Sequence, residues 1–260
     1  MASYVIAGAS RGLGYQYLQT LSSNPSNTVI GLARNPSAVK SQLASDGITN
    51  VHIFAGDLTS PSSLSAAATE VSKIANGKVD HLIVNGAYVS DKTSSLTPTG
   101  FIGNEELLKS DFEASINTNV VGVIYTINAF LPLIKAGSVK KVVVISTGMT
   151  EPDLIKEAEV AASVTYAASK AATNVVVYKY ATELKSEGII FLALSPGLVR
   201  TGLPEEMYDY LAEVFRKYEP GFKGAISTQE SVEAQLKVIQ GVGIEQSGEF
   251  LSHLGTKRWL

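Results

Sequence analysis

The chain has 260 residues, of which 45% are hydrophobic and 17% charged, which is an ordinary globular composition with enough length for one large α/β domain. The formal net charge of -3 does not favour nucleic acid or an anionic membrane as a partner, and we expect neither. The absence of cysteine excludes a disulfide framework and a thiol nucleophile, and three scattered histidines predict no metal site.

Short apolar runs alternate with helical patterns along the chain, and the alternation predicts the fold class. The predicted strands are Tyr4–Ala7, Thr28–Ala33, Val51–Phe54, His81–Asn85, Lys141–Ser146, Ile189–Ser195 and an edge strand Glu249–Leu251. The predicted helices are Gly12–Ser22, Ser37–Ser45, Pro61–Asn76, Lys109–Leu133, Tyr166–Ser186 and Gln229–Gln240. Because the strands are almost continuously hydrophobic, helices should cover both faces of the sheet. We therefore expect one α/β domain over residues 1–260, a doubly wound parallel sheet (Rossmann fold) of about seven strands.

The beginning of the sequence has neither a basic segment nor a long apolar run, so it predicts no signal peptide. We find no uncharged run of about 18 apolar residues and expect no membrane span. The lack of cysteine agrees with the cytosol, so we expect a cytoplasmic protein.

A glycine-rich turn joins the first predicted strand to the first helix. Glycine permits a tight turn, the approach of a pyrophosphate to the backbone and close packing of helix on strand, and the helix N-terminus offers N–H groups to phosphate. The spacing Gly-x-x-x-Gly-x-Gly differs from the usual Gly-x-Gly-x-x-Gly, but its position after the first strand predicts a nucleotide site. The candidate contacts in this turn are Gly8, Ser10, Arg11, Gly12, Leu13 and Gly14.

Tyr166 and Lys170 are four residues apart and share one face of the predicted long helix. An ammonium beside a phenol stabilises the phenolate, so we expect Lys170 to lower the pKa of Tyr166 and make it an acid or base at working pH. The same spacing also occurs in solvent-exposed helix pairs that have no catalytic role.

The glycine turn and the Tyr-x-x-x-Lys motif resemble the short-chain dehydrogenase/reductase family in order and spacing, over nearly the whole chain. Within that family the sequence is most similar to fungal ketoreductases of the norsolorinic-acid reductase type. The resemblance implies that Tyr166 donates the proton, that Lys170 also binds the nicotinamide ribose, and that Asn119 distorts its helix to hold a water in a proton relay. It also implies a hydroxyl at the end of the fifth strand that polarises the substrate carbonyl. Alignment favours Thr147 and residue type favours Ser146, so both are candidates.

Arg34 follows the second strand, where an acidic residue would hold the ribose 2′-hydroxyl of NAD. Arg34 and Arg11 suit a 2′-phosphate instead, so the sequence predicts NADP(H), although two solvated surface arginines would give the same pattern. By resemblance Asp57, with Leu58, contacts the adenine. Asp57 is equally suited to cap the helix that begins near Pro61.

The resemblance places further cofactor contacts after the fourth and sixth strands. Val84-Asn85-Gly86-Ala87 stands where the family usually has Asn-Asn-Ala-Gly, which leaves Asn85 and Gly86 as candidates. The segment Ser195–Thr201 resembles the Pro-Gly segment at the nicotinamide end of the cofactor, and its candidates are Pro196, Gly197, Val199 and Thr201.

Two segments are candidates for the substrate side. Residues 202–228 resemble the family's mobile substrate lid, and their aromatic side chains suit an apolar or aromatic substrate or else pack in the core or in a subunit interface. Met149–Ser163 is longer than usual and acidic, and we expect a helical insertion that shapes one wall of the cleft. By resemblance, the small or apolar outer faces of the long helices, for example Ala171 and Val175, imply a homo-oligomer, either a dimer or a tetramer.

These features predict an NADP(H)-dependent oxidoreductase that reduces a ketone to an alcohol, or the reverse, and acts on an apolar or aromatic, secondary-metabolite type of substrate. Two alternatives remain open. The altered Val84–Ala87 segment and the undecided hydroxyl are compatible with a non-redox cyclase or isomerase on the same scaffold. An NADP(H)-binding regulatory protein would need the glycine turn but not the Tyr-Lys-Asn set.

Overall fold

A computed structural model describes residues 2–260, in which one seven-stranded sheet forms the centre of the molecule. All neighbouring strands are parallel and their order is β3-β2-β1-β4-β5-β6-β7. The strands are β1 (Ser3–Ala7), β2 (Thr28–Ala33), β3 (Val51–Ala55), β4 (His81–Val84), β5 (Lys141–Ile145), β6 (Ile190–Ser195) and β7 (Phe250–Ser252). The strand order reverses between β1 and β4, which is the point where doubly wound folds bind ligands. The predicted fold class is confirmed.

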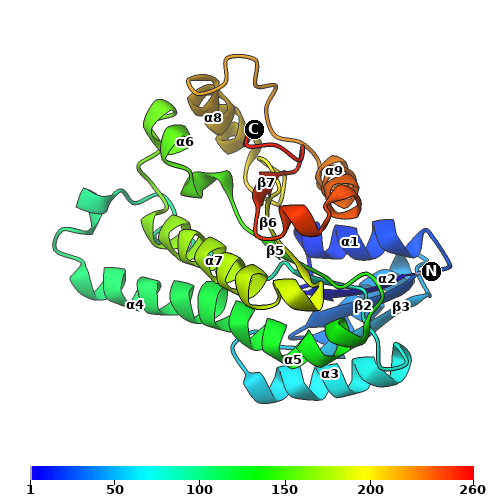
Figure 1. The fold of residues 1–260 in the computed structure, drawn as a ribbon. Helices are drawn as coiled ribbons and strands as arrows, with labels where there is room; N and C mark the ends of the chain where they lie inside the picture. The colour runs from blue at the N-terminus through cyan, green and yellow to red at the C-terminus, as the bar shows by residue number, and fades with distance from the viewer. Residues whose placement is uncertain (1) are drawn as a thin grey trace.

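Helices cover both faces of this sheet (Figure 1). They are α1 (Gly12–Ser22), α2 (Pro36–Ser45), α3 (Pro61–Ile74), α4 (Glu105–Ile116), α5 (Gly122–Ala136), α6 (Pro152–Glu157), α7 (Val164–Glu183), α8 (Glu205–Arg216) and α9 (Thr228–Gly241). One core cluster lies under α3, α5 and α7, and the other under α1, α2 and α9. Side chains alternate along a strand, so Val5 and Ala7 of β1 enter the first cluster while Tyr4 and Ile6 enter the second.

The long helix predicted for Lys109–Leu133 extends further at both ends. It runs from Glu105 to Ala136 as α4, a π-helical turn over Asn117–Val121, and α5. Glu105 and Glu106 occupy its first turn, where their negative charges interact favourably with the positive end of the helix dipole and stabilise the helix. By length and composition this helix could cross a membrane, since an 18-residue window of it has a mean hydropathy of 1.4, so the expectation of no membrane span stays a prediction. Core helices of globular folds meet the same criterion, and α5 packs against the sheet.

Candidate functional site

The glycine turn brings three backbone segments closer together than any side chain would permit. A Cβ on Gly8 would lie 2.4 Å from the Cα of Gly86, and a Cβ on Gly14 would lie 2.0 Å from the carbonyl oxygen of Gly8. Gly8 and Gly12 have φ values of 86° and 55°, in the region that favours glycine. Two of the predicted roles, the tight turn and the close helix–strand packing, are therefore confirmed. Of the other candidates here, Ser10 and Arg11 are exposed and Leu13 is buried against the sheet.

The segment after β4 supports this turn despite its altered sequence. The Asn85 side-chain amide donates to the Gly8 carbonyl at 2.9 Å, and the N–H groups of Asn85 and Gly86 both donate to the Ala7 carbonyl at 2.9 Å. The sequence left the placement of Asn85 undecided. The structure brings Asn85 and Gly86 directly against the glycine turn.

Asp57 closes a turn rather than capping a helix. Its carboxylate accepts from the N–H and hydroxyl of Thr59 at 2.9 and 2.8 Å, while the cap of α3 is Ser60. The N-cap interpretation of Asp57 was therefore wrong, because the helix begins three residues too late for it. The Thr59 N–H is the main cause that lowers the pKa of Asp57, with smaller effects from the Thr59 hydroxyl and the charge of Arg34. The neighbouring Leu58 is buried.

The Pro-Gly segment after β6 lies on the other side of the glycine turn. A Cβ on Gly12 would lie 3.6 Å from the Thr201 methyl carbon. The Pro196 carbonyl accepts from the Ser231 hydroxyl at 2.7 Å, Val199 forms a bridge with Ile226, and Gly197 has a φ of 81°. These contacts hold the segment in place, so the predicted cofactor residues from β1, β4 and β6 gather at one end of the sheet.

One face of α7 carries Tyr166, Lys170 and Asn174 against the end of β5. The Lys170 side chain is 2% exposed, and its Nζ donates to the Ile145 carbonyl at 2.7 Å and lies 6.0 Å from the centroid of the Tyr166 ring. The Ser146 hydroxyl donates to Oδ1 of Asn174 at 2.7 Å. The structure thus brings together Tyr166, Lys170 and the hydroxyl-bearing end of β5.

Burial governs the ionisation of this pair. Burial raises the pKa of Tyr166 to about 12 and lowers the pKa of Lys170 to about 8. The expected lowering of the tyrosine pKa by Lys170 is therefore wrong. Desolvation penalises the phenolate and the ammonium alike, and it is the cause of both shifts. Tyr166 is a protonated phenol at neutral pH, which is the form that donates a proton.

The two candidate hydroxyls at the end of β5 differ in their environment. Ser146 is 1% exposed and its hydroxyl proton is directed at Asn174. Thr147 is half-buried, and its Oγ1 accepts from the Met149 N–H at 3.3 Å, which leaves the Thr147 hydroxyl proton available for another acceptor. Because β5 ends at Ile145, strand alternation does not fix the direction of either side chain.

Asn119 lies in the π-helical turn between α4 and α5, so the distortion expected at this residue is present. The side chain is fully buried and forms three hydrogen bonds. Its Oδ1 accepts from the Tyr88 N–H at 2.7 Å, and its Nδ2 donates to the Tyr88 carbonyl at 3.0 Å and to the Ser169 hydroxyl at 2.9 Å. Asn119 therefore joins the loop after β4 to the helix that carries Tyr166.

The aromatic side chains of residues 202–228 divide between core and surface. Tyr208 and Phe215 are buried, whereas Tyr210 is exposed. The Tyr208 phenol oxygen accepts from the N–H groups of residues 201, 202 and 203, at 2.6, 3.1 and 3.1 Å. Core packing therefore explains part of the aromatic content of this segment.

The acidic insertion is helical, as expected. It forms a short 3-10 turn and α6, whose Leu154 is buried in the core. An ion pair between Glu159 and Lys217 links the insertion to the end of α8.

Sequence reasoning missed Tyr88, Asp111, Ser169 and Asn174, which hold the site residues in place. Asn174 follows Lys170 by one helical turn, and that spacing was available in the sequence as a signal. Ser169 was also within reach of the sequence, because it lies next to Lys170 and its hydroxyl donates to the Tyr166 carbonyl at 2.7 Å. Tyr88 and Asp111 reach the site only through contacts between distant segments.

The chain is similar to known proteins along its whole length. A family profile described as short chain dehydrogenase matches residues 3–210. The sequence is 43% identical to the short-chain dehydrogenase/reductase AacuF of Aspergillus aculeatus and 38% identical to the short chain dehydrogenase virK of Hypocrea virens, and both matches cover all of both chains.

Solved structures agree with these matches. The NADPH-bound carbonyl reductase from chicken fatty liver has a TM-score of 0.80 and 25% identity, covering 98% of this chain and 93% of that one. The carbonyl reductase Sniffer of D. melanogaster shares the fold, with a TM-score of 0.78 and 20% identity over 98% of each chain. Profile, relatives and fold agree with the resemblance carried by the glycine turn and the Tyr166–Lys170 face, and the chain belongs to the short-chain dehydrogenase family.

Proposed function

We propose that this protein is an NADP(H)-dependent carbonyl reductase, which reduces an apolar or aromatic ketone to an alcohol or catalyses the reverse. The observation that carries the proposal is the face of α7 on which half-buried, protonated Tyr166 lies beside Lys170. Lys170 contacts the end of β5, where the hydroxyl proton of Thr147 is available. The chicken relative is named as an NADPH-bound carbonyl reductase, which supports the same chemistry.

The residues around the glycine turn fit a dinucleotide with a 2′-phosphate. Gly8 and Gly86 pack against each other with no room for a Cβ, which holds the glycine turn close to the loop after β4, and α1 begins at Gly12. Arg11 and Arg34 are both exposed there, which leaves their guanidinium groups available to a phosphate. When bound, the cofactor supplies the hydride that the reduction needs.

The protein's own side chains then stabilise and protonate the substrate oxygen as negative charge develops on it. Thr147 donates a hydrogen bond to the carbonyl oxygen and thereby stabilises the developing alkoxide. Tyr166 gives its phenolic proton to that oxygen. Lys170 provides a nearby positive charge that stabilises the tyrosinate left behind, and Asn119 keeps the surrounding helix and loop in place. We assign the polarising role to Thr147 because the Ser146 proton is already used within the protein.

The proposal is tested by following NADPH oxidation with a panel of aromatic and aliphatic ketones. Turnover with loss of NADPH is the expected result. Conversion of substrate without loss of NADPH would indicate the non-redox enzyme, and NADPH binding without turnover of any ketone would indicate a regulatory protein.

The preference for NADPH should depend on Arg34. Replacing it with aspartate removes a charge-assisted bond and places a carboxylate near the 2′-phosphate, so KM for NADPH should rise about 10- to 100-fold and turnover with NADH should improve. Steady-state kinetics with both cofactors measure this change. Lys40→Asp, the same charge change at an exposed position of α2, is the matched control. Equal cofactor kinetics in Arg34→Asp and Lys40→Asp would mean that Arg34 is only a solvated surface residue.

The reduction rate should fall above about pH 8, the pKa of Lys170. Burial lowers this pKa, so the ammonium that supports the tyrosinate is present below that pH and is lost above it. Tyr166 keeps its proton throughout this range because its pKa is about 12. Initial rates at saturating ketone and NADPH should therefore drop about tenfold per pH unit on the alkaline side. A rate that stays constant to about pH 10 would show that the charge of Lys170 is not needed.

A further inference from the structure

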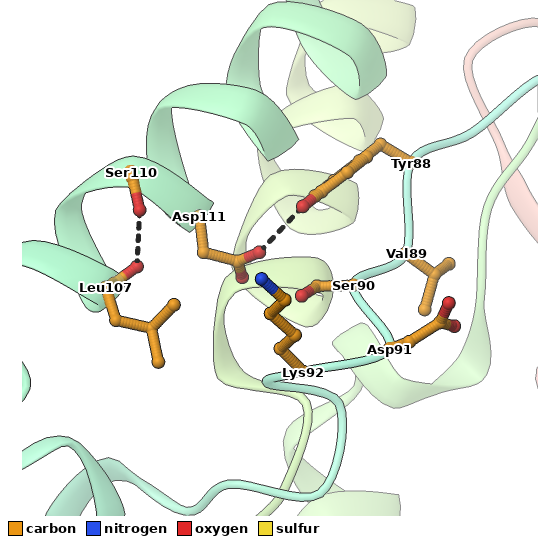
Figure 2. Close-up of a pocket in the computed structure, with 8 residues that line it drawn as sticks. All are labelled: Tyr88, Val89, Ser90, Asp91, Lys92, Leu107, Ser110 and Asp111. Atoms are coloured by element: carbon orange, nitrogen blue, oxygen red, sulfur yellow. Dashed lines mark hydrogen bonds between the residues drawn. The ribbon is translucent and has the colours of Figure 1, made fainter.

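Asp111 on α4 is a buried carboxylate that binds hydroxyl groups from two other segments. It is 3% exposed. Its Oδ2 accepts from Thr93 at 2.7 Å and from Thr165, and its Oδ1 accepts from the Tyr88 phenol at 3.1 Å. Figure 2 shows the Tyr88 hydroxyl and the Asp111 carboxylate pointing toward one another. Among residues 2–260 Asp111 forms no salt bridge, so these hydroxyls compensate its burial.

These hydroxyls also keep the carboxylate ionised. Burial raises the pKa of Asp111, but the hydrogen bonds from Thr165, Thr93, Ser90 and Tyr88 outweigh burial and leave the pKa below its usual value. A carboxylate is acceptor-only, so it can bind all of these donors together, which an amide cannot do.

The first connection runs from Asp111 to Tyr166. Thr165 immediately precedes Tyr166 in the first turn of α7. The cap residue of α7, Ser163, has a φ of 59° and does not cap the helix with its side chain. Its hydroxyl donates instead to the Ser94 carbonyl at 2.6 Å. The beginning of α7 is thus held to α4 by the Thr165–Asp111 bond and to the loop after β4 by the Ser163–Ser94 bond.

The second connection runs from Asp111 to Asn119. The phenol of Tyr88 binds Asp111, while the backbone N–H and carbonyl of Tyr88 both bind the Asn119 side chain. Asn119 in turn donates to Ser169, one turn along α7 from Tyr166. One carboxylate therefore reaches both Tyr166 and Asn119 through a single intermediate residue in each case.

We propose that Asp111 is a positioning residue for proton transfer, which fixes Tyr166 through Thr165 and Asn119 through Tyr88. Asp111 touches neither substrate nor cofactor in this role, and the inference rests on the proposed reductase function. Asp111→Asn keeps the shape of the side chain but replaces one acceptor oxygen with a donor. The hydroxyls that face the new NH2 group, either those of the two threonines or that of Tyr88, can then no longer donate to this side chain.

The test compares Asp111→Asn with Asp91→Asn. Asp91 is exposed and lines the same cavity of about 420 Å³ beside Asp111. Asp91→Asn therefore makes the same change from carboxylate to amide at a residue outside the hydrogen bonds that Asp111 forms with Thr93, Thr165 and Tyr88. Asp111→Asn should lower kcat about 10- to 100-fold, as expected when a reacting group is displaced by about 1 Å. KM for NADPH should stay within about twofold, because the cofactor turn is formed by β1 and β4. The solvent deuterium isotope effect on kcat should increase, since proton transfer becomes slower, and Asp91→Asn should match the wild type in all three.

Several outcomes would overturn the inference. One is an unchanged kcat in folded Asp111→Asn, and another is a fall in kcat with an unchanged isotope effect or a parallel rise in KM for NADPH. If Asp111→Asn fails to fold, Thr165→Val and Tyr88→Phe keep the carboxylate and remove one connection each. Each should lower kcat about 3- to 10-fold, and wild-type kcat in both would overturn the inference. A wild type that reduces no ketone overturns the proposed function as well, whereas an active wild type with equally active variants overturns only the role of Asp111.

Discussion

Replacing Tyr166 with phenylalanine should lower kcat for ketone reduction by about 100- to 10,000-fold, the contribution of a positioned general acid. The substitution removes one hydroxyl and keeps the aromatic ring, so the packing of α7 should be preserved. Because the pKa of Tyr166 is about 12, the phenol is fully protonated at neutral pH and its loss removes the proton donor rather than a base. The measurement is the rate of NADPH oxidation at saturating ketone.

Tyr178→Phe is the matched control for this change. Tyr178 lies on the same helix but is 41% exposed, so loss of its hydroxyl should leave kcat unchanged. NADPH binding, followed by quenching of protein fluorescence, should be similar in both variants and the wild type. If Tyr166→Phe kept kcat within about tenfold of the wild type with NADPH bound, another group would have to supply the proton.

Local patterns were sufficient to predict the fold, and they pointed to the residues that make up the candidate site. The alternation of apolar strands with helical segments is repeated along the chain, and α1, α2 and α3 each contact the strand that precedes them. The glycine turn and the Tyr166–Lys170 face each lie within a few residues of sequence, so their geometry follows from the helix or turn that holds them.

The remaining features of the site depend on packing between distant segments. Thr165 and Asp111 are 54 residues apart, and Ser146 and Asn174 are 28 apart, so a single sequence gives no signal that they meet. The pKa of Tyr166 also could not be predicted from local sequence. The four-residue spacing of Tyr166 and Lys170 suggested that the lysine charge would lower this pKa, but desolvation of the phenol in the fold raises it.

Gly8→Ala should destabilise the protein and weaken NADPH binding together. Alanine at a φ of 86° costs about 1–2 kcal/mol, and forcing a methyl group into packed backbone costs about 1–3 kcal/mol more. The new Cβ would lie 2.4 Å from the Cα and 2.5 Å from the N of Gly86, so the glycine turn and the loop after β4 must separate. The free energy of unfolding, measured by urea denaturation, should fall by about 2–5 kcal/mol, and Kd for NADPH should rise at least about tenfold.

Gly47→Ala separates the two contributions to this effect. Gly47 has a φ of 72°, but nothing lies within 4 Å of the position that its Cβ would take. Gly47→Ala should therefore lower the free energy of unfolding only by the backbone strain of about 1–2 kcal/mol and leave Kd for NADPH unchanged. The difference between the two variants measures the contact between Gly8 and Gly86. If Gly8→Ala bound NADPH as tightly as Gly47→Ala does, the close approach of these two loops would be a packing feature of the fold and not a requirement of the cofactor site.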